Sequence, residues 1–203
     1  MSTGNGMGIV NVQELYRGIK RRAEKVKSVC IHLLVTAVLA SAAVAHDAGN
    51  LEASVNDDGW KSVEIEDMEL SWTHSQDTFI FRVTAPTEGW VSVGFQGGPA
   101  MKDAAIYIGY AEGSEGYFRD DHGTSPISHQ PDTQLGGSDG IIEASAWESE
   151  GYTSLEITVA AEPSDELDYL LAEGSEVRII LAYGSSDSFS GMHSEAHTAE
   201  VEL

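Results

Sequence analysis

The side chains most able to do chemistry in this chain are seven histidines, one cysteine and 33 carboxylates, and few of them are spaced as in a known catalytic motif. The sequence has no Gly-x-Ser-x-Gly elbow, no glycine-rich phosphate loop that leads into a helix and no His-Glu-x-x-His zinc motif. Pairs such as Asp120-Asp121 or Glu148 and Glu150 are expected in so acidic a chain. The sequence therefore predicts neither a hydrolase nor a nucleotide-binding enzyme, and we interpret these pairs as a solvated face.

Three histidines, His74, His122 and His129, lie in predicted turns. His122 lies just before a long polar segment and His129 lies within it; both carry imidazoles of the type that bind metal ions, but no spacing fixes a site. Surface histidine is the favoured interpretation.

One methionine and one further histidine have ordinary interpretations by residue type. Met101 follows a Gly-Pro-Ala turn, and His193 lies in a polar segment near the C-terminus. Residue type alone favours a plain role for each, because methionine commonly fills gaps in a core and loop histidines are commonly solvated.

The first 45 residues differ from the rest and are predicted to be a signal peptide. A basic segment from Arg17 to Lys27 precedes an apolar run from Val29 to Ala45, which ends in small residues. The run is shorter than the roughly 20 apolar residues of a membrane-spanning helix, so cleavage near Ala45 is favoured over a retained anchor. The only cysteine, Cys30, would leave with this leader. We therefore expect export to a periplasmic or extracellular location, with membrane attachment only if the leader is retained.

Acidic residues dominate the mature chain. The leader holds 6 Lys+Arg and 2 Asp+Glu, so 5 and 31 remain, a net charge of about −26. Nucleic acids and anionic membranes need a basic footprint on their partner, and both are therefore excluded as expected partners. A saline habitat and an ordinary acidic exported protein both remain open.

Period-two alternation of apolar residues predicts strands over most of the mature chain. We expect a polar lead-in over residues 46–59 and one domain over residues 60–203. Two stretches do not alternate: 124–137 is expected to be a long loop, and 164–173 to hold at most one helical turn. Around nine or ten short strands with little helix predict an all-β fold, a two-sheet antiparallel β-sandwich of immunoglobulin-like type.

Two consecutive segments carry a family resemblance. The first is Gly89-Trp90-Val91-Ser92-Val93-Gly94-Phe95, and the second is Met101-Lys102-Asp103-Ala104-Ala105-Ile106-Tyr107-Ile108-Gly109. Together they resemble the signature of the DOMON family, with Ala105 where the family usually has Asp. The similarity continues in order through Tyr117-Phe118-Arg119-Asp120 and the segment from Ile180 to Phe189, and it spans Trp60 to Leu203.

The resemblance implies a haem b site. In cytochrome members of the family, a methionine after the first strand and a late histidine are the axial ligands, and the matching positions are Met101 and His193. Thioether and imidazole ligands give a six-coordinate iron suited to electron transfer. His197 is the rival ligand, less favoured because the family usually has a small residue there. The expected aromatic walls of the haem pocket are Trp90, Phe95, Tyr107, Tyr183 and Phe189.

The function implied is that of an exported cytochrome-type domain that passes single electrons and is not itself an enzyme. Its acidic surface would suit a basic redox partner such as an oxidoreductase. The alternative is a haem-free DOMON module that binds a sugar or another small ligand, and a third interpretation is a lectin-like or structural surface protein. The fold cannot choose among them.

Overall fold

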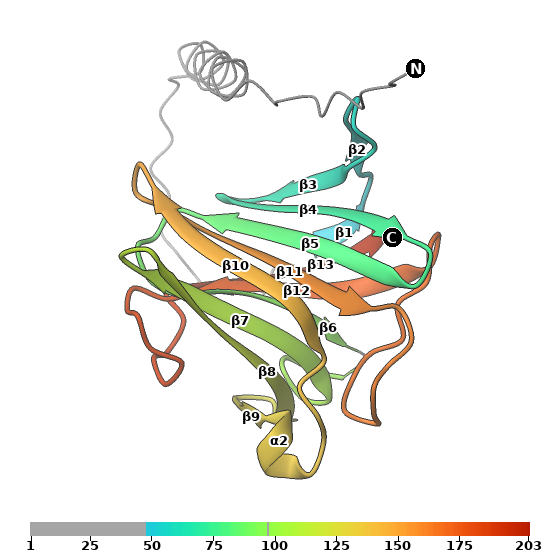
Figure 1. Ribbon diagram of the computed structural model, residues 1–203. Helices are drawn as coiled ribbons and strands as arrows, with labels where there is room; N and C mark the ends of the chain where they lie inside the picture. Colours follow the sequence, from blue (N-terminus) through green and yellow to red (C-terminus); the bar gives the residue numbers. More distant parts are fainter. Residues whose placement is uncertain (1–47, 97) are drawn as a thin grey trace, which may run out of the picture. The chain divides into compact units, whose positions relative to one another are not determined.

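A computed structural model describes residues 48–96 and 98–203 (Figure 1). The predicted leader, with its cleavage position near Ala45, lies outside the described residues. Within them the chain forms thirteen strands and one four-residue helix. No helix among these residues is long and apolar enough to cross a membrane.

The strands form two sheets. The seven-stranded sheet has the order β1-β13-β12-β6-β7-β8-β9. Its strands are β1 (Ala48–Leu51), β13 (Glu195–Glu202), β12 (Glu176–Tyr183), β6 (Val91–Gln96), β7 (Ala104–Glu112), β8 (Glu115–Ser125) and β9 (Ser128–Pro131). All neighbours in this sheet are antiparallel except β1 and β13, which are parallel.

The six-stranded sheet is antiparallel throughout and has the order β10-β11-β5-β4-β3-β2. Its strands are β10 (Ile141–Ser149), β11 (Tyr152–Ala160), β5 (Thr78–Ala85), β4 (Met68–Ser75), β3 (Lys61–Ile65) and β2 (Ser54–Val55). The prediction of a two-sheet β-sandwich is confirmed.

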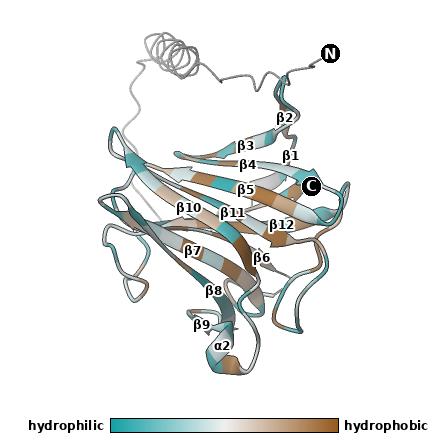
Figure 2. Ribbon diagram, in the orientation of Figure 1, coloured by the Kyte–Doolittle hydropathy of each residue, from teal (hydrophilic) through white to brown (hydrophobic). Residues whose placement is uncertain are grey.

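Alternating side chains of the two sheets form the core between them. In β5 every second residue is buried, beginning with Phe79, Phe81 and Val83, and hydrophobic residues lie mainly in the strands (Figure 2). Phe81 of the six-stranded sheet contacts Phe95 of the seven-stranded sheet, with ring centroids 4.7 Å apart. Because period two places alternate residues on opposite faces, this pattern fixes which side of each strand points inward.

The strand count exceeds the nine or ten expected. Residues 46–59 were expected to be a polar lead-in, yet they contain β1 and β2, which span only four and two residues and are too short to carry an alternation signal. The stretch 124–137 was expected to be a loop but holds the end of β8, all of β9 and helix α2 (Asp132–Leu135) at one end of the sandwich (Figure 1). Backbone pairing, which does not depend on hydrophobicity, forms these elements.

Residues 164–173 do not form the helical turn that their apolar residues allowed. Backbone N–H groups in this stretch instead donate hydrogen bonds to a side chain. The carboxylate of Asp168 accepts from the backbone N–H of Ser164, at 2.9 Å, and of Asp165, at 3.3 Å. Such local bonds from aspartate compete with helix formation.

Phe81→Ala should lower the free energy of unfolding by about 3–5 kcal/mol, because it opens a cavity in the centre of the core. Urea denaturation of the full chain measures the change. Val55→Ala is the control, since Val55 is 66% exposed. An equal loss of stability in both variants would contradict the placement of the core.

Candidate functional site

The central strands β12, β6 and β7 of the seven-stranded sheet are apolar on both faces. The strand register places Val93 opposite Tyr107 and Leu181 on the inner face. One residue further along, Gly94 lies opposite Ile106 and Ile180 on the other side of the sheet. We define the outer face as Ser92, Gly94, Ile106, Ile108, Ile180 and Ala182. An antiparallel sheet that packs on one side usually shows polar residues on the other, whereas every side chain of the outer face is buried.

Met101 covers one end of the outer face. It lies in the connection between β6 and β7, is partly buried, and packs against Ala104, Ile106 and Ile180. The backbone N–H of Asp103 donates to the carbonyl of Gly123 in β8, at 2.8 Å.

Gly123 lets this connection approach β8 closely. A Cβ atom at Gly123 would overlap the carbonyl group of Met101. The absence of a side chain there therefore allows Met101 to lie over the sheet.

The connection from β12 to β13, residues 184–194, covers the other end of the outer face. Its Phe189 packs against the cluster of Trp90, Ile108 and Ala182. The backbone N–H of Gly184 donates to the carbonyl of Trp90, at 2.9 Å, and the N–H of Trp90 donates to the carbonyl of Ser186, at 3.2 Å. These bonds tie the connection to the start of β6.

His193 lies in this same connection and is exposed. The next residue, Ser194, donates its backbone N–H to the carbonyl of Tyr183, at 2.7 Å. Met101 and the segment with His193 thus border one apolar face from opposite ends of β6 and β12.

His197 has a different position. It pairs with Leu181 in the register of β12 and β13 and lies on the face that carries the buried Ala199 and Val201. Its side chain is 24% exposed and its Nε2 lies 3.9 Å from Glu195. His197 is therefore on the opposite side of the sheet from Met101.

The aromatic residues predicted as pocket walls divide between the two faces. Trp90 and Phe189 belong to the outer-face cluster. Phe95 and Tyr107 belong to the core between the sheets, and Tyr183 packs against that core. Phe95 has the same parity as Val91 and Val93 within β6, so strand alternation carried the signal that separates it from the outer face.

Two arginines flank the outer face, a feature that no sequence motif indicated. Arg119 forms ion pairs with the fully buried Asp121 and lies over the ring of Phe189, 4.7 Å from its centroid. Arg178 donates from Nη1 to the carbonyl of Gly98, at 2.9 Å. Residues 48–203 contain only five Lys and Arg, and two of these five lie beside the outer face.

Two polar side chains on this side of the sheet differ in whether they have a bonding partner. His129 was expected to be a surface histidine, but its ring pairs with the buried Asp121. The indole Nε1 of Trp90 is buried without a hydrogen-bond partner. A buried donor without a partner costs free energy, and a polar group of a ligand would relieve that cost.

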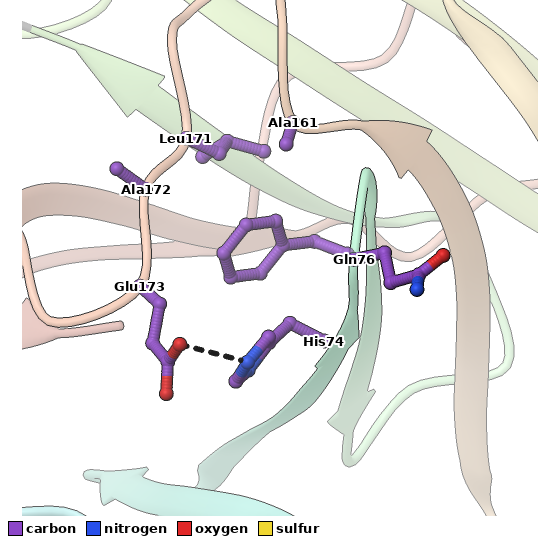
Figure 3. A pocket seen from close by; sticks show the side chains of 7 residues that line it. His74, Gln76, Ala161, Leu171, Ala172 and Glu173 are labelled. Carbon is purple, nitrogen blue, oxygen red and sulfur yellow. Dashed lines mark ion pairs between the residues drawn. The ribbon is translucent and has the colours of Figure 1, made fainter.

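A cavity of about 280 Å³ lies elsewhere, between the turn that joins β4 to β5 and the segment 161–173 (Figure 3). It is lined by His74, Gln76, Phe79, Ala161, Leu171, Ala172 and Glu173. His74 and Glu173 face one another, with Nε2 and Oε2 3.1 Å apart. None of the residues predicted for the site lines this cavity, and its volume is at the lower end for a small-molecule pocket.

The fold and the outer face define an all-β sandwich in which one sheet offers an apolar surface between two connections. A model of the DOMON domain matches residues 64–184, more than half of the chain. The chain belongs to the DOMON family.

Two solved structures share the fold. The cytochrome b domain of pyranose dehydrogenase from Coprinopsis cinerea superposes with a TM-score of 0.52 at 12% identity, over 70% of this chain and 81% of that one. The cytochrome domain of Myriococcum thermophilum cellobiose dehydrogenase superposes with a TM-score of 0.55 at 10% identity, over 74% and 87%. At these identities the likeness establishes the fold.

Gly123→Ala should lower the free energy of unfolding by about 1–3 kcal/mol, because the new methyl group forces the connection with Met101 away from β8. Gly94→Ala is the matched control within the same sheet, since its Cβ would meet Ile106 and Ile180 at 3.4–3.5 Å, an ordinary contact. Urea denaturation compares the two. A Gly123→Ala protein as stable as Gly94→Ala would contradict the close approach.

Burial also perturbs an acidic group on the inner face. Asp120 pairs with Tyr107 in the register of β7 and β8 and is 4% exposed. Burial raises the pKa of Asp120 from 3.8 to about 8. The backbone N–H of Gly140, which donates to Oδ2, opposes that rise. Three neighbouring carboxylates add to it: those of Asp132, Asp168 and Asp139.

This shift predicts that the free energy of unfolding falls as the pH rises. Between about pH 4 and pH 8 the folded protein holds a proton on Asp120 that the unfolded chain has lost, so unfolding becomes easier by up to about 1.4 kcal/mol per pH unit. Asp120→Asn should remove that contribution, leaving a smaller one of the same sign from Asp132, whose pKa burial raises to about 6. Urea denaturation across this pH range in a chelating buffer measures the slopes, and the exposed Asp77→Asn variant should keep the wild-type slope. Equal slopes in wild type and Asp120→Asn would refute the assignment.

Proposed function

We propose that this protein is a haem b-binding electron-transfer module, with Met101 and His193 as the axial ligands of the iron. The observation that carries the proposal is that Met101 and the segment with His193 border the same apolar face of the seven-stranded sheet. Membership of the DOMON family and the shared fold of two cytochrome domains support it.

Residues of the kinds that a haem group needs lie at the outer face. A porphyrin needs an apolar surface, and Ile106, Ile108 and Ile180 supply apolar side chains. Ser92 and Gly94, at the centre of the outer face, are small and project little above the sheet. The two carboxylates of a haem need cationic or N–H partners. Arg119, Arg178 and the unpartnered Nε1 of Trp90 supply groups of that kind around the face.

Each residue of the proposed site has its own task. Met101 would supply a thioether and His193 a neutral imidazole, and bound haem with this pair supplies one-electron transfer at a raised potential. Phe189 and Trp90 would exclude water from one end of the face. Phe95, Tyr107 and Tyr183 contribute by supporting the sheet from its inner side.

His193 is preferred to His197 as the second ligand. His197 extends from the side of the sheet that carries Leu181 and Ala199, whereas Met101 covers the other side. His193 lies in a connection that already packs against the outer face through Phe189.

The proposed module is a carrier of electrons and not a catalyst. Two axial protein ligands leave no coordination position for a substrate. We further propose an exported protein, in the periplasm or outside the cell, that exchanges electrons with an oxidoreductase. With 33 acidic against 11 basic residues in the whole chain, complementary charge would favour a basic partner surface and speed the encounter.

The test is a visible absorption spectrum of the mature protein, oxidised and dithionite-reduced, after expression with haem and after haem titration. The wild type should give a low-spin b-type spectrum with one haem per chain. Met101→Ala and His193→Ala should each lose the low-spin bands, because each removes one axial ligand. Met192→Ala and His197→Ala are the matched controls and should keep the wild-type spectrum; Met192 is 87% exposed.

Other outcomes would assign a different function. A wild-type protein that stays colourless after titration would exclude the haem proposal and favour the haem-free alternative, a module that binds a sugar or another small ligand. Loss of the spectrum in His197→Ala but not in His193→Ala would reverse the ligand assignment. Circular dichroism of each variant separates loss of haem from loss of the fold.

A further inference from the structure

Three aspartates from separate segments meet inside the protein, away from the outer face. Asp120 lies on β8, Asp132 is the first residue of α2, and Asp168 lies in the connection between β11 and β12. One carboxylate oxygen from each lies within 4.8 Å of the other two. We call these three residues the aspartate cluster.

The cluster is buried and lacks internal compensation. Asp120 is 4% exposed and Asp132 is fully buried. Neither oxygen of Asp132 has a hydrogen-bond partner, and Oδ1 of Asp120 and Oδ1 of Asp168 also have none. Buried carboxylate oxygens are normally paired or bound to a metal ion, so four unpartnered oxygens in one place point to a cation as their partner.

No lysine or arginine within residues 48–96 and 98–203 forms an ion pair with the cluster. The ion pairs of Arg82, Lys102 and Arg119 go to other carboxylates. His122 lies near Asp132, but its Nδ1 is engaged with the carbonyl of Leu167, at 2.9 Å. Protonation of Asp120 and Asp132, whose pKa values burial raises, is the remaining way to reduce the charge when no cation is bound.

The surroundings hold two of the carboxylates in place. Oδ2 of Asp168 accepts from the backbone N–H and the hydroxyl of Ser164, at 2.9 and 2.5 Å, which leaves Oδ1 available. Oδ2 of Asp120 accepts from the N–H of Gly140, at 2.7 Å. A Cβ at Gly140 would lie 3.0 Å from Asp120 Oδ2 and 3.2 Å from Asp168 Oδ1. Glycine at that position therefore keeps space beside both carboxylates.

We propose that the aspartate cluster is a calcium site that joins β8, α2 and the β11–β12 connection. The donors are all oxygen, which selects a hard cation. Two oxygens bound to one Ca²⁺ can be at most about 4.8 Å apart, twice a Ca–O distance of about 2.4 Å, and the cluster meets that limit. Calcium also accepts irregular geometry and completes its shell with water, which suits a site with three protein carboxylates.

The site is independent of the proposed haem site, because Asp120 lies on the inner face and Met101 covers the outer face. Calcium would neutralise the buried charge and cross-link three segments, so it should stabilise the folded chain by mass action. It should also make stability less dependent on pH, since the carboxylates bind metal in their ionised form.

Isothermal titration calorimetry and thermal unfolding of the full mature chain test the proposal, with chelator-treated protein, CaCl₂ as the probe and about 150 mM salt as background. The wild type should bind one Ca²⁺ per chain and unfold at a higher temperature when it is present. Asp132→Asn should raise the dissociation constant for Ca²⁺ at least about tenfold, because it removes one charged ligand. The same variant should unfold no more easily than wild type without calcium, because it removes an uncompensated buried charge.

Asp77→Asn, an exposed carboxylate outside the cluster, is the control and should bind like wild type. If Asp132→Asn does not fold, Asp168→Asn replaces it. Binding without a defined stoichiometry, or equal binding by the cluster variant and wild type, would show that the acidic surface alone attracts the ion and would overturn the proposal. Equal affinity for MgCl₂ would overturn the choice of calcium. None of these results depends on whether haem is bound.

Discussion

The shared register of β12, β6 and β7 is the constraint on which the rest of this structure depends. It places Val93, Tyr107 and Leu181 on one side of the sheet and Gly94, Ile106 and Ile180 on the other. Both sides are apolar, so each side must pack against another part of the protein. The six-stranded sheet covers the first side, and two connections cover the second. A slip of one residue in this register would exchange the two faces and would remove Met101 from its contacts.

The fold could be predicted from the sequence because the main signal, alternation of apolar residues, is also the physical cause of the sandwich. Strands β1, β2 and β9 could not, since they are short and form through backbone pairing without an apolar pattern. Met101 and His193 were identified from the order of motifs, a resemblance that carries no information about distance. Parity within β6 could have separated Phe95 from the outer face.

The aspartate cluster could not have been found in the same way. Its members lie on three elements that only the closed sandwich brings together, in a chain where carboxylates are common. The structure distinguishes them from the other acidic residues by burial: Asp132 is completely buried, whereas most of the others are exposed. The same distinction applies to Arg119 and Arg178, which are ordinary in sequence and meaningful only through their place beside the outer face.

Strand β1 affects the tendency of the protein to self-associate. It lies parallel to β13 and occupies what would otherwise be an open edge of the seven-stranded sheet. Unpaired strand edges are templates for association between chains. A fragment that began at Trp60, where the alternating pattern starts, would keep nearly all of the core yet expose the backbone groups of β13 along one side. Such a fragment would be prone to associate edge to edge, so the short segment ahead of Trp60 protects the sheet from aggregation by covering β13.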